Sequence, residues 1–169
     1  DFDADGYTSG AQIYSALKQL DFNVEWLETK RVDGYGFSEA CIQQSAQKAA
    51  DIIITCDLGS TNAPQFKLAK DLASQAGRAL AVVVLDHHQV EAVKTAKPAD
   101  IFINPTTWGI PDLAPLCAAG LAFMTLRWLH EQGGVFSAFN PNSGLDLATL
   151  GTFCDRVPLS GVNRAICRP

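Results

Sequence analysis

Residues 51–59, DIIITCDLG, and residues 79–88, ALAVVVLDHH, decide the fold class. Both begin as short apolar runs rich in β-branched residues, a pattern typical of strands buried in a parallel sheet. Both then end in polar groups, namely Asp57 in the first stretch and the DHH triplet at 86–88 in the second. Ligands of parallel α/β sheets bind outside the carboxyl ends of the strands. The two stretches therefore predict one sheet with one functional edge.

Helical patterns separate these strands along the chain. Strands that alternate with helices indicate βαβ units, so we predict an α/β fold with a doubly wound, mainly parallel sheet and helices on both faces. Alternating polarity in NVEWLET predicts a further strand over residues 23–29. The predicted helices cover residues 8–20 with Thr8 or Ser9 as N-cap, 38–50 with Ser38 as N-cap, 62–77, 117–134 and 145–155.

A third polar motif, DFDADG, occupies residues 1–6 and resembles the start of an EF-hand calcium loop. Such a loop needs a bidentate Glu at its twelfth position, where this chain has Gln12. Its eighth position is usually apolar, and here it is Thr8. A calcium loop is therefore excluded. We expect instead a strand ahead of the motif, which would carry its aspartates to the same sheet edge as Asp57.

Five carboxylates would then share one sheet edge: Asp1, Asp3, Asp5, Asp57 and Asp86. Two unit charges ~4 Å apart repel by about 4 kcal/mol at an effective dielectric near 20, and raised pKa values relieve only one or two such groups. Carboxylates with one or two imidazoles suit Mn²⁺ or Mg²⁺ better than Zn²⁺. The sequence therefore predicts a site for two divalent metal ions, which activate water and hold a phosphoryl group.

The bulk composition is that of an ordinary globular domain, with 169 residues, 47% hydrophobic and 18% charged residues, and a net charge of −5. No apolar run reaches the ~18 residues of a membrane span, and no signal-peptide pattern is present. The five cysteines are odd in number and lack CxxC spacing. This favours free thiols over a disulfide framework or a zinc site, and we expect a cytoplasmic protein with no membrane partner.

Each motif alone also has a purely structural interpretation. Asp-Gly sequences are common turns, the DLG sequence at 57–59 suits a turn after a strand, and the histidines at 87–88 suit a surface pair. Cys56 and Cys154, beside the acids, are expected to be packing residues. The metal-site prediction therefore depends on all the motifs meeting at one edge.

Four segments resemble, in order and over nearly the whole chain, the motifs of the DHH phosphoesterase superfamily. Within it the resemblance is to the RecJ family of single-stranded-DNA exonucleases, since RVDGYGFSEACI at 31–42 and INP at 103–105 resemble that family too. The four motifs are DFDADGYTSGA at 1–11, IITCDLGS at 53–60, VVVLDHHQ at 82–89 and LATLGTFCDRVPLSGVNR at 147–164.

The resemblance implies a residue set for catalysis on two Mn²⁺ or Mg²⁺ ions. Asp57 would bridge both ions, and His88 would stabilise the charge of the scissile phosphate. Asp86 would orient a histidine from behind the ligands. The implied metal ligands are Asp1, Asp3, Asp5, Asp57, His87 and Asp155, and the implied catalytic residues are Asp57, His87, His88 and Asp155.

Substrate contacts are implied outside the acidic motifs. Arg31 and the turn Gly34-Tyr35-Gly36 would contact DNA phosphates, through a cation and a backbone that can approach closely. Arg156 stands where the family usually has a small or aliphatic residue, and it would bind phosphate or pair with a nearby acid.

We expect residues 1–169 to form a DHH catalytic domain cut at both ends, without its first strand and without the DHH-associated and OB-fold domains. The resemblance implies that the full protein hydrolyses single-stranded DNA 5′→3′ in repair and recombination, with a single-strand-binding protein or a helicase as candidate partners. This part alone is expected to be weak or inactive.

Two alternatives stay open. One is a DHH phosphatase or phosphodiesterase for short oligonucleotides or small nucleotides. The other is a non-catalytic scaffold, for which Leu58, where the family usually has Asn, and Arg156 leave room.

Overall fold

Three parallel strands form the sheet of this protein, in the order β1-β2-β3. The computed structural model of the chain describes residues 2–28, 36–90 and 99–168. In the register of the strands Ile53 lies beside Val82, and Val84 beside Phe102. The strands are β1 (Ile52–Cys56), β2 (Ala81–Leu85) and β3 (Ile101–Ile103).

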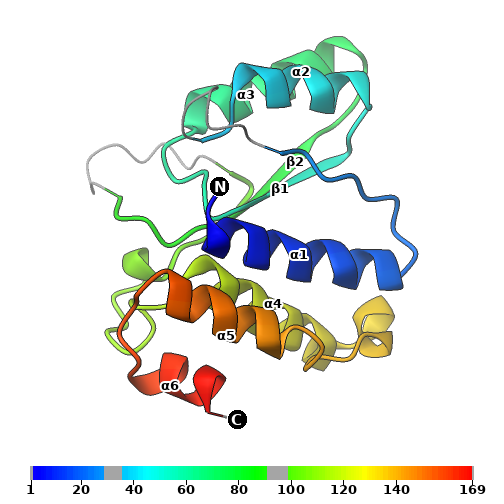
Figure 1. Cartoon of the computed structure of the whole chain (residues 1–169). Helices are drawn as coiled ribbons and strands as arrows, with labels where there is room; N and C mark the ends of the chain where they lie inside the picture. Colours follow the sequence, from blue (N-terminus) through cyan, green and yellow to red (C-terminus); the bar gives the residue numbers. More distant parts are fainter. Residues whose placement is uncertain (1, 29–35, 91–98, 169) are drawn as a thin grey trace.

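Helices cover both faces of the sheet (Figure 1). Helices α2 and α3 lie on one face, and α1, α4 and α5 lie on the other. This arrangement confirms the predicted α/β fold. The helices are α1 (Ala4–Gln19), α2 (Glu39–Gln47), α3 (Ala63–Gln75), α4 (Ala118–Gln132), α5 (Leu145–Cys154) and α6 (Gly161–Cys167), with short 3₁₀ helices η2 (Pro105–Thr107) and η3 (Gly134–Ala138).

A separate apolar core lies on each face of the sheet. Val82 and Val84 of β2 pack with Phe66 of α3 on one face, while Leu85 packs with Ile13 of α1 on the other. Phe66 is fully buried, and burying a side chain of this size stabilises a fold by about 1.5–3 kcal/mol. Side chains of β2 thus point to both faces of the sheet and pack against helices on each. This packing fixes the position of the carboxyl end of β2.

All five predicted helices are present, as α1 to α5. Ser38 caps α2 as predicted, accepting a hydrogen bond from the Cys41 N–H at 3.3 Å. Pro64 lies in the first turn of α3 and Gly77 follows its end. Four elements of the described chain were not predicted: the three-residue strand β3, helix α6 and the 3₁₀ helices η2 and η3.

Helix α1 begins inside the acidic motif. Asp3 is its N-cap, with its carboxylate accepting the Gly6 N–H at 3.0 Å. The prediction that Thr8 or Ser9 caps this helix is wrong, because both lie within it and donate their hydroxyls to carbonyls of the preceding turn. Thr8 bonds to the Ala4 carbonyl and Ser9 to the Asp5 carbonyl, each at 2.7 Å.

Residues 23–28 are irregular, so the predicted strand over 23–29 is wrong for this described part, while residue 29 lies outside it. A strand needs a hydrogen-bonded neighbour, and among the described residues β1 pairs only with β2. Trp26 packs on α1 instead, where a Cβ on Gly10 would come within 2.5 Å of its ring. Residues 23–28, α1 and β1 border a cavity of about 470 Å³.

Strand β1 is only half enclosed. Ile53 and Thr55 are buried, but Ile52 is 58% and Ile54 is 37% exposed. The expectation of a fully buried strand is therefore wrong for β1, because it forms one edge of the described sheet. No helix in the described part of the chain is both long and apolar enough to cross a membrane.

Candidate metal centre

Asp57 lies at the carboxyl end of β1, where the chain turns sharply. Its N–H still donates to the Leu85 carbonyl of β2 at 2.8 Å, but its φ of +63° is left-handed. Few residues other than glycine adopt this conformation, although Asp tolerates it better than most. Gly59 completes the turn with a φ of +121°, and a Cβ there would lie 2.7 Å from Thr55 Oγ1. The turn holds the Asp57 side chain buried at the sheet edge.

Asp5 joins α1 to the start of α4. Its Oδ2 accepts the Ala118 N–H at 2.7 Å and its Oδ1 accepts the Ala119 N–H at 2.8 Å. A helix N-terminus favours negative charge, so the start of α4 stabilises the buried carboxylate of Asp5. Helix α5 approaches from another side, and a Cβ on Gly151 would come within 2.9 Å of Asp5 Oδ1.

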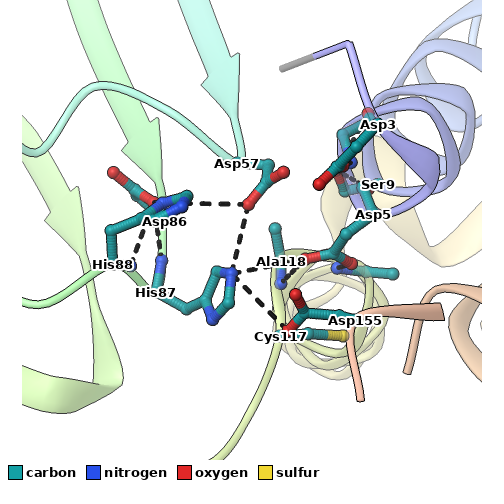
Figure 2. Close-up of polar contacts among 12 residues, drawn as sticks. Asp3, Asp5, Ser9, Asp57, Asp86, His87, His88, Cys117, Ala118 and Asp155 are labelled. Atoms are coloured by element: carbon teal, nitrogen blue, oxygen red, sulfur yellow. Dashed lines mark hydrogen bonds and ion pairs between the residues drawn. The ribbon is translucent and has the colours of Figure 1, made fainter. Parts of the chain in front are cut away.

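His87 faces three carboxylates that come from three different elements (Figure 2). Asp5 belongs to α1, Asp57 follows β1, and Asp155 caps the end of α5. Distances from His87 Nε2 are 3.2 Å to Asp57 Oδ1, 3.6 Å to Asp5 Oδ2 and 3.8 Å to Asp155 Oδ2. Asp5 and Asp155 are 150 positions apart in the sequence, and yet both side chains lie next to this one nitrogen.

Asp86 holds the other histidine of the triplet. Its Oδ1 accepts hydrogen bonds from the His87 N–H at 2.8 Å and the His88 N–H at 3.2 Å, and it lies 2.7 Å from His88 Nδ1. Its Oδ2 accepts the Ser60 N–H at 2.9 Å. Burial opposes ionisation of Asp86, but the hydrogen bonds of His88 and Ser60 outweigh it and lower the Asp86 pKa. In return, the bond to Asp86 raises the pKa of His88 to about 9.

The acids that face His87 have the opposite tendency. Burial raises the pKa of Asp57 to about 6, against the hydrogen bond with His87 and with the help of the charges of Asp5 and Asp3. Burial also raises the pKa of Asp155, again against His87. Burial lowers the pKa of His87, yet the neighbouring carboxylates prevail and the net pKa is raised. Burial and the mutual repulsion of the carboxylates thus outweigh the effect of His87 on these acids.

The donor set fits divalent cations. Two groups each bring their ligand atoms within 4.8 Å of one another: Asp57 with His87 and His88, and Asp5 with His87 and Asp155. His87 belongs to both groups, so two adjacent ions would share this corner of the protein. Carboxylate oxygens with imidazole nitrogens are ligands that Mn²⁺ and related ions accept. A bound cation would also reverse the raised carboxylate pKa values.

Asp3 lies at the mouth of the cluster. It is exposed, it caps α1, and its charge contributes to the raised pKa values of both Asp57 and Asp155. Asp1, the remaining acid of the predicted ligand set, lies outside the described residues.

The predicted DNA contacts are placed only in part. Arg31, Gly34 and Tyr35 lie outside the described residues. Gly36 has a φ of +92° and lies against the Asn62 side chain just before α3. Arg156 is exposed in a left-handed conformation with a φ of +60°, and its guanidinium has no hydrogen bond or ion pair with any described residue.

Two buried polar residues behind the cluster were not predicted to take part. Ser60 follows the β1 turn, and Asn104 follows β3. Asn104 donates hydrogen bonds to Ser60 Oγ at 3.0 Å and to the His88 carbonyl at 2.9 Å. The available signal was a polar residue directly after an apolar strand and before a proline, in the INP sequence at 103–105.

A sheet edge with these acids and this histidine triplet defines a class of protein, and residues 1–152 match the model of the DHH family, N-terminal domain. The chain belongs to the DHH family.

Curated relatives of the chain carry the name single-stranded-DNA-specific exonuclease RecJ. The protein from Haemophilus influenzae is 35% identical over 176 residues, covering 98% of this chain and 29% of the relative. The one from Dickeya dadantii is 37% identical over 186 residues, with 98% and 29% covered. The one from Bacillus subtilis is 31% identical over 168 residues, with 98% and 20% covered. The chain thus spans less than a third of the length of these relatives.

Proposed function

We propose that this chain is the catalytic domain of a two-metal phosphodiesterase that degrades single-stranded DNA from the 5′ end, as part of a longer protein. The observation that carries the proposal is the position of His87 Nε2, within 3.8 Å of carboxylate oxygens from three separate elements. The substrate class comes from the names of the relatives. A single-strand-binding protein or a helicase is the kind of partner such an enzyme would have.

Each side chain has a role in this proposal. Asp5, Asp57, His87 and Asp155 would hold the ions, with His87 common to the two ligand groups and Asp3 at the open side. When bound, a pair of divalent ions activates water for attack on phosphorus and neutralises phosphate charge. Mn²⁺ and Mg²⁺ are the candidate ions.

His88 acts on the substrate itself. Its side chain is 55% exposed, and Asp86 binds its Nδ1, so Nε2 remains to face a ligand. With a pKa near 9 the ring carries a proton at neutral pH, and it donates that proton in a hydrogen bond to a phosphate oxygen. The charge that develops on the phosphate during hydrolysis strengthens this bond.

The central test is the substitution Asp57→Ala. We expect micromolar Mn²⁺ binding by the parent chain in calorimetry, and at least about 100-fold slower DNA hydrolysis by the full-length variant, because several kcal/mol of transition-state stabilisation depend on the ions. Asp71→Ala, which removes an exposed aspartate on α3, is the matched control. A chain that fails to bind Mn²⁺ would favour the scaffold alternative, and full activity of Asp57→Ala would reject the role of Asp57.

The substrate class needs a second measurement. We expect the full-length protein to degrade a 5′-labelled single strand of about 30 nucleotides faster than a dinucleotide, since single-strand binders gain affinity over several nucleotides. A strong preference for dinucleotides would replace the proposal with a short-oligonucleotide phosphodiesterase. A ladder of shortened strands that still carry the 5′ label would show degradation from the 3′ end and would overturn the proposed polarity.

A further inference from the structure

We propose that Asn104 is a positioning residue, which fixes His88 toward the phosphate by tying together the ends of all three strands. Asn104 is fully buried directly after β3. Its recorded hydrogen bond to His88 goes to the backbone carbonyl and not to the ring. The expected effect of Asn104 on catalysis rests on the proposed function. The hydrogen bonds by which Asn104 positions His88 do not depend on that function.

The Asn104 amide uses its complete hydrogen-bonding capacity. An amide side chain offers two N–H donors and two acceptor lone pairs. The Nδ2 group donates to Ser60 Oγ at 3.0 Å and to the His88 carbonyl at 2.9 Å. The Oδ1 atom accepts the Thr106 N–H at 3.0 Å and the Thr106 hydroxyl at 2.6 Å. Because all four positions are used, the amide has one well-defined orientation.

The backbone at Asn104 is equally restricted. Pro105 follows it, and a residue before proline is held in the extended region. The observed φ of −141° and ψ of +111° lie in that region. The η2 turn that Pro105 begins presents Thr106 to the amide oxygen. The side chain therefore projects from a rigid base.

Asp86 and Asn104 hold His88 at two different points. Asp86 binds the His88 ring through Nδ1, and Asn104 binds the His88 carbonyl. Ser60 links the two, since its N–H donates to Asp86 Oδ2 and its Oγ accepts from Asn104. Loss of the Asn104 donors would free the carbonyl while the Asp86 contact stayed, so the ring would change its direction rather than its partner.

Asparagine is the residue type that this position requires. An aspartate has the same size and keeps the acceptor for Thr106, but it has no donor and places a negative charge beside the His88 carbonyl. Asn104→Asp is therefore the sharpest variant. Asn163→Asp is the matched control: Asn163 is also buried and donates through Nδ2 to two carbonyls, those of Pro115 and Pro158, away from the histidines.

The first measurement is the proton resonance of the hydrogen-bonded His88 Nδ1–H in the parent chain and both variants, without added metal. We expect Asn104→Asp to shift this resonance, because the geometry to Asp86 changes while the contact remains, and Asn163→Asp to leave it in place. A folded Asn104→Asp chain with an unchanged resonance overturns the proposal. If Asn104→Asp does not fold, Ser60→Ala decides, since it removes only the Ser60 hydroxyl from the network; an unchanged resonance there has the same meaning.

The second measurement is hydrolysis of single-stranded DNA by the full-length protein. Residues behind catalytic groups typically contribute 10- to 100-fold, so we expect Asn104→Asp to lower kcat by about that factor with little change in Mn²⁺ affinity, and Asn163→Asp to leave kcat unchanged. Equal kcat for Asn104→Asp and the parent overturns the kinetic role. A parent that hydrolyses no phosphodiester would refute the proposed function instead, and the resonance would still decide the position of His88.

Discussion

At Asp57 the backbone adopts a left-handed conformation while its side chain faces the histidines. Such a conformation costs of order 1 kcal/mol or more for a residue other than glycine. The surrounding ladder holds it, since the Asp57 N–H continues the pairing of β1 with β2. Asp57 is thus kept in a strained backbone conformation, because an unstrained turn would point its carboxylate away from the histidines.

Asp86 offers a test of electrostatics at a single residue. In Asp86→Asn the carboxylate that holds the His88 ring becomes neutral, so we expect the His88 pKa to fall from about 9 toward its ordinary 6.5. An NMR titration of the imidazole in the metal-free chain measures this change. A His88 pKa that stays near 9 in the variant would assign the shift to another group.

Helix α5 brings its terminal acid to the cluster through a close contact. Gly151 lies one turn before Asp155, and a Cβ there would come within 2.4 Å of the Ala119 Cβ and 2.5 Å of Thr8 Oγ1. A side chain at this position would therefore push α5 away from α1 and α4. The absence of a side chain at Gly151 is what lets Asp155 reach His87.

We accordingly expect Gly151→Val to destabilise the fold by about 1–3 kcal/mol, the usual cost of overpacking, and to weaken Mn²⁺ binding. Thermal unfolding and calorimetry measure the two effects. Leu150→Val is the control, because Leu150 is 52% exposed on the same helix. Unchanged Mn²⁺ affinity in a folded Gly151→Val chain would mean that Asp155 is not a ligand.

The sequence predicted the elements whose signals are local. The apolar runs before Asp57 and Asp86 identified β1 and β2, and Ser38 identified the start of α2. The start of α1 was misplaced because Asp3, within the acidic motif, caps that helix in place of a hydroxyl residue. Strand β3, with only three residues, is too short for a periodic pattern.

The candidate site was predicted as a set of side chains, but not their supports. Acids after strands predict a common edge, which brought Asp57 and His87 together, while Asp5, in the first turn of α1, was placed there through an expected strand ahead of the motif that stays a prediction. The hydrogen bond between Ala118 of α4 and Asp5 joins residues 113 positions apart, and the bond between Asn104 and Ser60 joins residues 44 positions apart. Contacts of this kind depend on how helices and loops pack, and no local pattern encodes them.

Over the whole molecule, Asp57 and His88 act in the same direction, whereas the lowered pKa of Asp86 gives a contribution that is already complete above its ordinary value of 3.8. The pKa values of Asp57 and His88 are raised to about 6 and about 9, so both bind protons more tightly in the folded chain. Their contribution to the free energy of unfolding is complete below their ordinary pKa values, 3.8 for Asp57 and 6.5 for His88. It is lost as the pH rises through about 6 and about 9.

We therefore expect the metal-free chain to become less stable between about pH 5 and about pH 8, as measured by chemical denaturation. Saturating Mn²⁺ should oppose this loss, because metal ligands bind in their deprotonated form and affinity grows with pH. A metal-free chain whose stability rises over this range would contradict the raised pKa values.

The half-enclosed strand β1 has a consequence for the handling of this chain. An exposed strand edge with apolar side chains is a template for another chain and promotes aggregation, and Ile52 of β1 is 58% exposed. We expect Ile52→Lys to reduce light scattering of concentrated solutions, whereas Leu68→Lys, at an exposed position on α3, should not. If the parent chain and both variants scatter equally, β1 does not pair with another chain in solution. The strand edge that borders the 470 Å³ cavity then does not limit solubility.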